Sequence, residues 1–357
     1  MAVFKRDDII LLLGAGASAE AGIPDSEKMI DELESLIASD GKWTEFRKLY
    51  LYLRSSIIFA DGLEGAFGDL VSFNIERLVN VLDELMMKER HVLYPFVGAW
   101  NPKLQEVAGD DFENVRQFRS SIVQILRDQW VTLPRSESAD YYQGLLRFQQ
   151  EFEHPLRVFS LNYDLCVEQT CGYDQVQRGF VERIWDWRMF DEALEDQLPI
   201  LLYKLHGSLD WYFKGGQTHF VDATQTIEAN DYAMIFGTSY KLQYVDPFLF
   251  LAYELRKWTL ESARLIICIG YGFNDQHING ILAQALNQER GRILVAVTGP
   301  SDEGVELGRI VQSLNVAATQ VKVQTCGARE FFESELSLGS LSQFVSESEF
   351  YFPEVID

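Results

Sequence analysis

Short runs of apolar, strand-forming residues recur along this chain, and they constrain its fold more than any other feature. The first run is uninterrupted from Ile9 to Leu13. Several later runs are nearly as uniform. Strands that are apolar on both sides are typical of parallel sheets covered by helices on both faces. The predicted strands are residues 7–13, 156–162, 199–207, 231–237, 263–270, 292–299 and 320–326.

Helical patterns lie between these strands. Residues 25–39 place Ile30, Leu33 and Ile37 on one face, as in an amphipathic helix. The stretch from about residue 40 to 150 is mostly helical and interrupts the strand pattern. We therefore predict a doubly wound, Rossmann-like α/β fold with a mostly parallel sheet and a helical insertion. Its predicted parts are an α/β domain of residues 1–39 and 151–357, a helical insertion of residues 40–150, and domain helices at 247–262 and 274–290.

Composition excludes several classes of protein. The formal net charge of −23 disfavours direct nucleic-acid binding, because phosphate backbones are bound by clustered Lys and Arg. The sequence has no apolar stretch of about 18 residues and no apolar signal core near its start, so we expect a cytoplasmic protein that does not span a membrane. Its four cysteines form no C-x-x-C pair, which argues against a zinc site.

The first strand ends in the small residues Gly14-Ala15-Gly16-Ala17-Ser18. With Ala19, this segment fits the G-x-G-x-x-[GA] pattern that lets backbone N–H groups approach a pyrophosphate. A tight strand-to-helix turn without a ligand is the alternative interpretation. The acidic residue that an ordinary dehydrogenase carries about 20 residues later, at the end of its second strand, is missing, which disfavours that class.

Polar residues follow two of the later strands. Asn162 and Asp164 come just after the strand at 156–162, where doubly wound sheets bind ligands. The alternative is a turn that caps the next helix, a common use of Asn and Asp. His206 ends a strand and precedes Gly207, so a structural and a catalytic role are both open. Histidine as a residue type titrates near neutral pH, which suits a general base.

A second glycine-rich strand end follows residues 263–270. It contains Gly270 and Gly272, and Asp275 lies at the predicted start of the next helix. Two glycine-rich strand ends in one sheet indicate a ligand long enough to reach both. A dinucleotide is such a ligand.

Taken in order, these four stretches resemble the sirtuin superfamily. The matching segments are Gly14–Ser18 with Gly22–Pro24, Asn162–Asp164, His206–Gly207 and Gly270–Gly272. The zinc module of protein-deacylating sirtuins, with its two C-x-x-C pairs, has no counterpart here. Asn162-Tyr163-Asp164 and Lys204-Leu205-His206-Gly207-Ser208 instead resemble the bacterial branch that hydrolyses NAD in anti-phage defence, in which a helical insertion replaces the zinc module. That branch often has Gly-Tyr-Ser where this chain has Gly270-Tyr271-Gly272.

The resemblance implies an NAD hydrolase that cleaves the bond between nicotinamide and ribose without zinc. It implies that His206 acts as a base, that Asn162 holds the ribose or orients a water molecule, and that Asp164 orients Asn162 or the cofactor amide. Further expected NAD contacts are the phosphate cradle Gly14, Ala15, Gly16 and Ser18, with Gly270, Gly272 and, on the adenosine side, Asp275. An NAD-dependent protein deacylase and a non-catalytic nucleotide-sensing module remain the alternatives.

Control of such an activity is a further expectation. A free NAD hydrolase would harm its own cell, so we expect a homo-oligomer or a separate partner chain, for which the resemblance implies a HerA-like hexameric ATPase. The helical stretch offers a large apolar set for packing on the α/β domain or for a subunit contact. These residues are Ile75, Leu78, Val79, Leu82 and Leu85–Met87.

Overall fold

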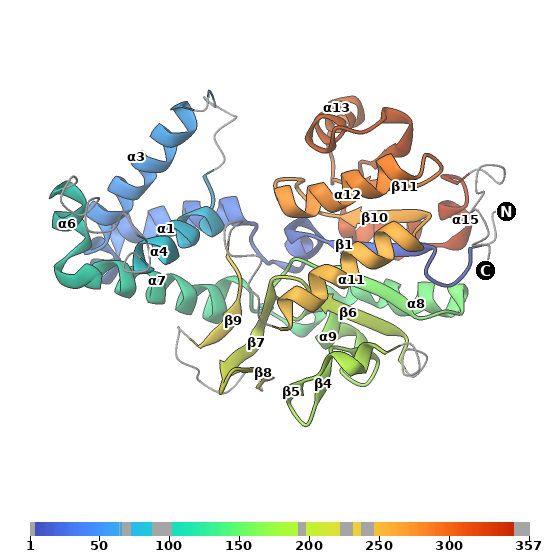
Figure 1. The fold of residues 1–357 in the computed structure, drawn as a ribbon, viewed down its shortest axis with the longest axis horizontal. Helices are drawn as coiled ribbons and strands as arrows, with labels where there is room; N and C mark the ends of the chain where they lie inside the picture. Colours follow the sequence, from blue (N-terminus) through green and yellow to red (C-terminus); the bar gives the residue numbers. More distant parts are fainter. Residues whose placement is uncertain are drawn as a thin grey trace.

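The computed structural model of the protein describes residues 4–63, 65, 73–87, 102–191, 198–221, 231–236 and 246–345. Its central feature is a seven-stranded sheet in the order β12-β11-β10-β1-β2-β6-β3, in which every neighbouring pair is parallel (Figure 1). The predicted doubly wound α/β fold is confirmed. The strands are β1 (Ile9–Leu13), β2 (Leu156–Ser160), β3 (Val176–Gln177), β6 (Ile200–Lys204), β10 (Leu265–Ile269), β11 (Ile293–Val297) and β12 (Val321–Gln324).

Alternation along the strands divides the core into two layers. In β1, Leu11 and Leu13 point to one face of the sheet and Ile10 and Leu12 to the other, as the period of two requires. The first face is covered by α8 (Gln143–Phe152), α9 (Cys166–Cys171), the π-helical turn η9 (Phe331–Glu335) and α15 (Leu338–Leu341). The second is covered by α11 (Phe248–Glu261), α12 (Gln276–Gln288) and α13 (Glu303–Leu314).

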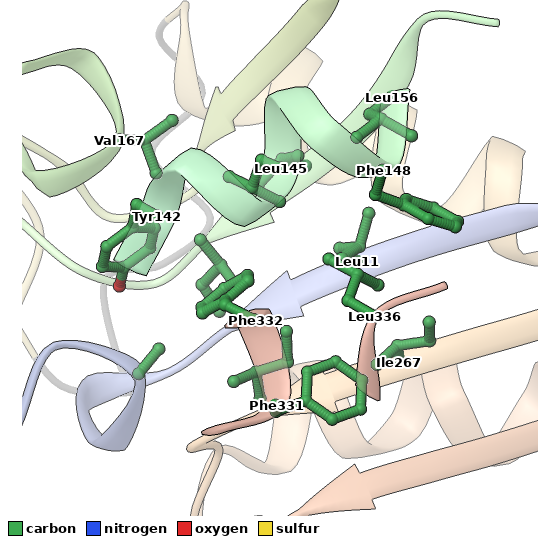
Figure 2. Packing of buried hydrophobic residues seen from close by; sticks show 14 of the residues in the cluster. Leu11, Tyr142, Leu145, Phe148, Leu156, Val167, Ile267, Phe331, Phe332 and Leu336 are labelled. Atoms are coloured by element: carbon green, nitrogen blue, oxygen red, sulfur yellow. The ribbon is translucent and has the colours of Figure 1, made fainter. Parts of the chain in front are cut away.

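The first of these layers joins distant parts of the chain. Figure 2 shows Phe332 of η9 below Leu145 of α8, with Leu11 of β1 to the right of Phe332 and Ile267 of β10 below Leu11. Tyr142 lies at the start of α8 and is 1% exposed, and its ring stacks on that of Tyr141 with centroids 4.9 Å apart. The segment that contains η9 therefore packs against α8 and against the two tyrosines that precede this helix, and holds them against the sheet.

A separate helical subdomain projects from the sheet, on the left in Figure 1. Its members are α1 (Ser26–Ser39), α2 (Gly41–Thr44), α3 (Arg47–Leu63), α4 (Ile75–Met86), α6 (Pro102–Ala108) and α7 (Glu113–Ile125). The helix predicted at 25–39 is present and begins where the Asp25 side chain accepts a hydrogen bond from the Lys28 N–H at 2.8 Å. It packs in the core of this subdomain and not on the sheet. The division at residues 39 and 150 stays a prediction, and residues 88–101 of the insertion lie outside the described residues.

The apolar set expected to offer a subunit contact is largely used inside the chain. Ile75, Leu78, Val79 and Leu82 are at most 1% exposed and belong to the core of the helical subdomain, with Leu85 and Met86 packed against it. These four side chains cannot reach a second subunit. The homo-oligomer itself stays a prediction.

A second, antiparallel sheet lies below the first one in Figure 1, in the order β4-β5-β8-β7-β9. The strand predicted at 231–237 belongs here, because β9 pairs with β7 and not with the parallel sheet. Gly207 begins β7 at φ 86°, and a Cβ there would lie 2.0 Å from the Ala233 carbonyl oxygen, so only glycine fits. The strands are β4 (Phe180–Val181), β5 (Ile184–Trp185), β7 (Gly207–Lys214), β8 (Gln217–Phe220) and β9 (Tyr232–Met234).

Candidate functional site

Strand register brings the four sequence motifs to one edge of the parallel sheet. Leu13 is opposite both Ile269 and Ser160, and Ser160 is opposite Lys204. These are the last residues of β1, β10, β2 and β6. The residues that follow them in sequence therefore leave the sheet side by side, at the carboxyl edge where α/β sheets bind ligands.

The glycines of the first motif face another backbone. The Gly14 N–H donates to the Ile269 carbonyl and the Gly16 N–H to the Gly270 carbonyl, both at 2.9 Å. A Cβ on Gly14 or Gly16 would lie 2.6 or 2.8 Å from the Gly270–Tyr271 backbone, and one on Gly270, at φ 61°, would lie 2.1 Å from the Ala17 nitrogen. Close packing of two loops therefore accounts for all three glycines without a ligand. Their predicted contact with phosphate stays a prediction.

The segment after Gly14 is a 3-10 helix, η1 (Ala15–Ala21), which ends at Gly22 with φ 89°. Ala15 is exposed, whereas Ser18 is 0% exposed. The Ser18 hydroxyl already pairs with the Tyr142 hydroxyl at 2.9 Å, and Tyr141 donates to the Ala17 carbonyl at 2.7 Å. Ala15 is thus the most exposed member of the predicted cradle, and Gly16 is partly exposed.

Asn162 connects two of the motifs. Its amide nitrogen donates to the Gly14 carbonyl at 2.9 Å and to the Ser18 hydroxyl at 3.3 Å. Its backbone N–H donates to the Ser160 hydroxyl at 3.1 Å. Asn162 is 8% exposed, so the protein encloses most of it. The role expected for it in binding ribose or water stays a prediction.

Asp164 forms a turn before the next helix, which was the alternative to a ligand-binding role in the sequence analysis. Its carboxylate accepts the Cys166 N–H at 3.0 Å, which is an Asx turn at the start of α9. Its main-chain carbonyl accepts a hydrogen bond from the buried Lys204 ammonium. The side chain is 5% exposed. An additional contact with the cofactor stays a prediction.

His206 lies in the turn between β6 and β7, two residues beyond the end of β6. Its Nε2 is 3.4 Å from the Asp275 Oδ2, without the alignment of a hydrogen bond, and among the described residues neither ring nitrogen has a hydrogen-bond partner. The His206 carbonyl accepts the Ile235 N–H at 2.9 Å, and the Tyr163 hydroxyl donates to the Ile235 carbonyl at 2.6 Å. The backbone of Ile235 therefore links the turn that carries His206 to the loop that carries Asn162 and Tyr163.

Asp275 comes from the β10 side of the site. Its carboxylate caps α12 by accepting the His277 N–H at 3.0 Å and the Ile278 N–H at 3.3 Å. Gly272, three residues earlier, is exposed, and its carbonyl accepts a hydrogen bond from Arg309 at 2.8 Å. The structure therefore brings Asp275 to His206, a pairing that the sequence did not predict.

A small cleft opens beside Asn162, between the sheet edge and the helical subdomain. Its volume is about 40 Å³, and Ala15, Asn162, Tyr163 and Glu76 are among its lining residues. Burial raises the pKa of the Tyr163 hydroxyl well above its usual value, and the nearby Glu76 carboxylate raises it further. Glu76 of α4 therefore faces the site from the helical side.

Part of this chain is similar to a known protein family. Residues 156–317 match the family model of the SIR2-like domain. This region holds Asn162, His206 and Asp275, and the match supports an NAD-related, sirtuin-like function. A solved structure of Sir2Tm bound to a propionylated peptide is similar over 91% of this chain and 90% of its own, with 11% identity and a TM-score of 0.38. The search of curated proteins found no match.

Neither a metal centre nor a membrane span is found in the part of the chain that the structure describes. No group of three or more His, Cys, Asp and Glu side chains there is arranged to hold a metal ion. No helix there is long and apolar enough to cross a membrane. All four cysteines are free thiols.

Lys204, Glu76 and Tyr142 were not among the predicted site residues, although Lys204 belongs to a segment that carries the resemblance. Lys204 carried a signal, because it is a charged residue inside the apolar run PILLYKL. Glu76 and Tyr142 carried none, since an acid in a helix and a tyrosine before one are ordinary features. Their position beside Tyr163 and Ser18 depends on contacts between segments that are far apart in sequence.

Proposed function

We propose that this protein binds NAD at the carboxyl edge of its parallel sheet and cleaves the bond between nicotinamide and ribose. The observation that supports this most is that neighbouring strand ends at this edge carry both the Asn162 amide, which is bound to the Gly14 carbonyl, and the His206–Asp275 pair. Polar side chains that converge at the switch point of a parallel sheet are the usual arrangement of a nucleotide site. The match to the SIR2-like domain supports NAD as that nucleotide.

In the proposed reaction, the C–N bond breaks and its electron pair stays on the ring nitrogen, so nicotinamide leaves as a neutral molecule. The ribose then carries oxocarbenium-like positive charge, as in glycoside cleavage. Water attacks the anomeric carbon and its proton passes to a base, for which His206 is the candidate. Asp275, 3.4 Å from the imidazole, would stabilise the protonated ring, and the Asn162 amide would orient the ribose or the water.

We also propose that NAD binding needs an opening beside Asn162. The cleft there is lined by Asn162 but by neither His206 nor Asp275, and its volume of about 40 Å³ is far below the roughly 300–1,000 Å³ of typical small-molecule sites. Met29 and Leu126 of the helical side line this cleft opposite Leu161. NAD would therefore enter when the helical subdomain moves away from the sheet edge, which would make that subdomain a natural point of control.

We further propose that the activity depletes NAD in bacterial anti-phage defence and is controlled by self-assembly or by a separate chain such as a HerA-like ATPase. The purified chain would then be weakly active alone. Turnover per subunit would rise with protein concentration as oligomers form. Light scattering and the nicotinamide assay over one concentration series test both parts. A monomer with full, concentration-independent turnover would contradict the proposed control.

The reaction itself is tested by incubating the full chain with NAD, with and without an acetyl-lysine peptide. We expect nicotinamide and ADP-ribose in equal amounts without the peptide, measured by liquid chromatography. Release of nicotinamide only with the peptide, together with its deacetylation, would make the protein a deacylase. NAD binding by calorimetry with no product in either mixture would make it a nucleotide-sensing module.

A further inference from the structure

Four charged side chains are buried together behind the candidate site. Glu168 of α9, Arg178, Lys204 of β6 and Asp210 of β7 are all at most 6% exposed. Arg178 is 2.5 Å from Asp210 and 3.4 Å from Glu168, and Lys204 is 3.6 Å from Glu168. Two acids and two bases make this cluster neutral, which a group so far from water requires.

Lys204 connects the cluster to the candidate site. Its ammonium donates to the main-chain carbonyl of Asp164, in the loop that carries Asn162. The Asp164 carboxylate accepts the Cys166 N–H at the start of α9, the helix that holds Glu168. The loop is thus held at Asp164 by both the lysine and the helix, and His206 follows Lys204 by two residues.

The hydrogen bonds of the cluster are incomplete. Both oxygens of Glu168, one oxygen of Asp210 and the Nε of Arg178 are buried without a hydrogen-bond partner in the described structure. Such a cluster adds little stability compared with apolar residues of the same size, because desolvation offsets the attraction between the charges. A gain in stability is therefore a weak reason for its presence, whereas fixing one geometry is a stronger one.

We propose that Lys204 is a positioning residue, which holds the Asn162–Asp164 loop in its working geometry through the Asp164 carbonyl. Glu168, with Arg178 and Asp210 behind it, holds the ammonium in place. This inference rests on the proposed NAD cleavage and adds to it a residue that does not touch the nucleotide. The competing explanation is that Lys204 only balances the charge of Glu168.

Two variants separate these explanations. Lys204→Met keeps the buried stem but removes the ammonium, leaving Glu168 and Asp210 with Arg178 alone. The double variant Lys204→Met/Glu168→Gln restores the charge balance but not the bond to the Asp164 carbonyl. If Lys204 positions the loop, kcat falls by about 10–100-fold in both variants, as expected when a catalytic group is misplaced by about 1 Å. The affinity for NAD changes by less than about threefold in both, while the melting temperature recovers in the double variant.

Two results for kcat would overturn the positioning role of Lys204. Recovery of kcat together with the melting temperature in the double variant would show that Lys204 only balances charge. Unchanged kcat in Lys204→Met would remove any role. Lys322→Met, at an exposed position of β12, is the matched control and should behave as the wild type.

Hydrogen exchange keeps this test independent of the proposed function. Amides of residues 161–166 should exchange faster in Lys204→Met and in the double variant, measured by mass spectrometry without NAD. If the wild-type chain releases no nicotinamide, the proposed function fails while the exchange still tests the positioning role. If the wild-type chain turns over NAD and exchange of this segment is unchanged in both variants, the positioning role alone fails.

Discussion

Asn162→Ala is the substitution for which the structure allows the most complete prediction. The amide of Asn162 donates to the Gly14 carbonyl and the Ser18 hydroxyl, and alanine loses both bonds. Neither acceptor is orphaned, because Gly14 still accepts the Ala17 N–H at 2.9 Å and Ser18 still pairs with Tyr142 at 2.9 Å. The cost is therefore the net value of two hydrogen bonds, about 0.5–1.5 kcal/mol each, or about 1–3 kcal/mol together.

This cost converts into a measurable change in melting temperature. An unfolding entropy of about 2.1 cal/mol/K per residue gives about 0.75 kcal/mol/K for 357 residues that unfold as one unit. Asn162→Ala should therefore lower the melting temperature by about 1–4 °C. Release of nicotinamide should fall much further, by about 10²–10⁴-fold, because a positioned polar group is lost from the site.

Asn114→Ala is the matched control for this experiment. Asn114 lies in the helical subdomain and donates its amide to the Val107 carbonyl at 3.0 Å, so alanine there removes one hydrogen bond and should cost about half as much stability without loss of turnover. Thermal unfolding and the nicotinamide assay on both variants complete the test. Wild-type turnover in a folded Asn162→Ala protein would refute the catalytic role, and an unchanged melting temperature would refute the structural one.

Three further substitutions test the remaining parts of the site. His206→Gln should abolish nicotinamide release with a smaller loss of stability than Asn162→Ala, because its ring nitrogens have no hydrogen-bond partner in the described structure; full turnover would remove His206 as the base. Ala15→Asp should weaken NAD binding about tenfold or more in calorimetry, because Ala15 is exposed on the cleft and a carboxylate there repels phosphate. Ala15→Ser is the control and should not weaken binding. Equal NAD affinities of the two variants would mean that phosphate binds elsewhere. Gly270→Ala should destabilise the protein by more than about 2 kcal/mol in denaturant unfolding, because φ is 61° and the new Cβ would lie 2.1 Å from the Ala17 nitrogen; wild-type stability would contradict the close packing of the two loops.

Patterns within single segments were enough to predict six strands of the parallel sheet, but not the two-residue strand β3 (Val176–Gln177). Most of the six are short apolar runs, and burial on both faces leaves that signal in the sequence itself. The ends were predicted less well: the run at 199–207 was expected to be one strand, but β6 stops at Lys204 and β7 begins at Gly207 in another sheet. The cause is the positive φ of Gly207 and its contact with Ala233, which no periodicity records.

The sequence by itself therefore determined the fold class and the residues at the strand ends, because both depend on local composition and order. Only the tertiary structure decided what those residues meet. It placed the backbone of Gly270 against Gly14 and Gly16, and Asp275 beside His206. It also placed the Lys204 ammonium on the Asp164 carbonyl, in the loop that carries Asn162. Each of these contacts joins segments separated by tens to hundreds of residues, and it exists only because parallel strands in register bring their carboxyl ends to one edge.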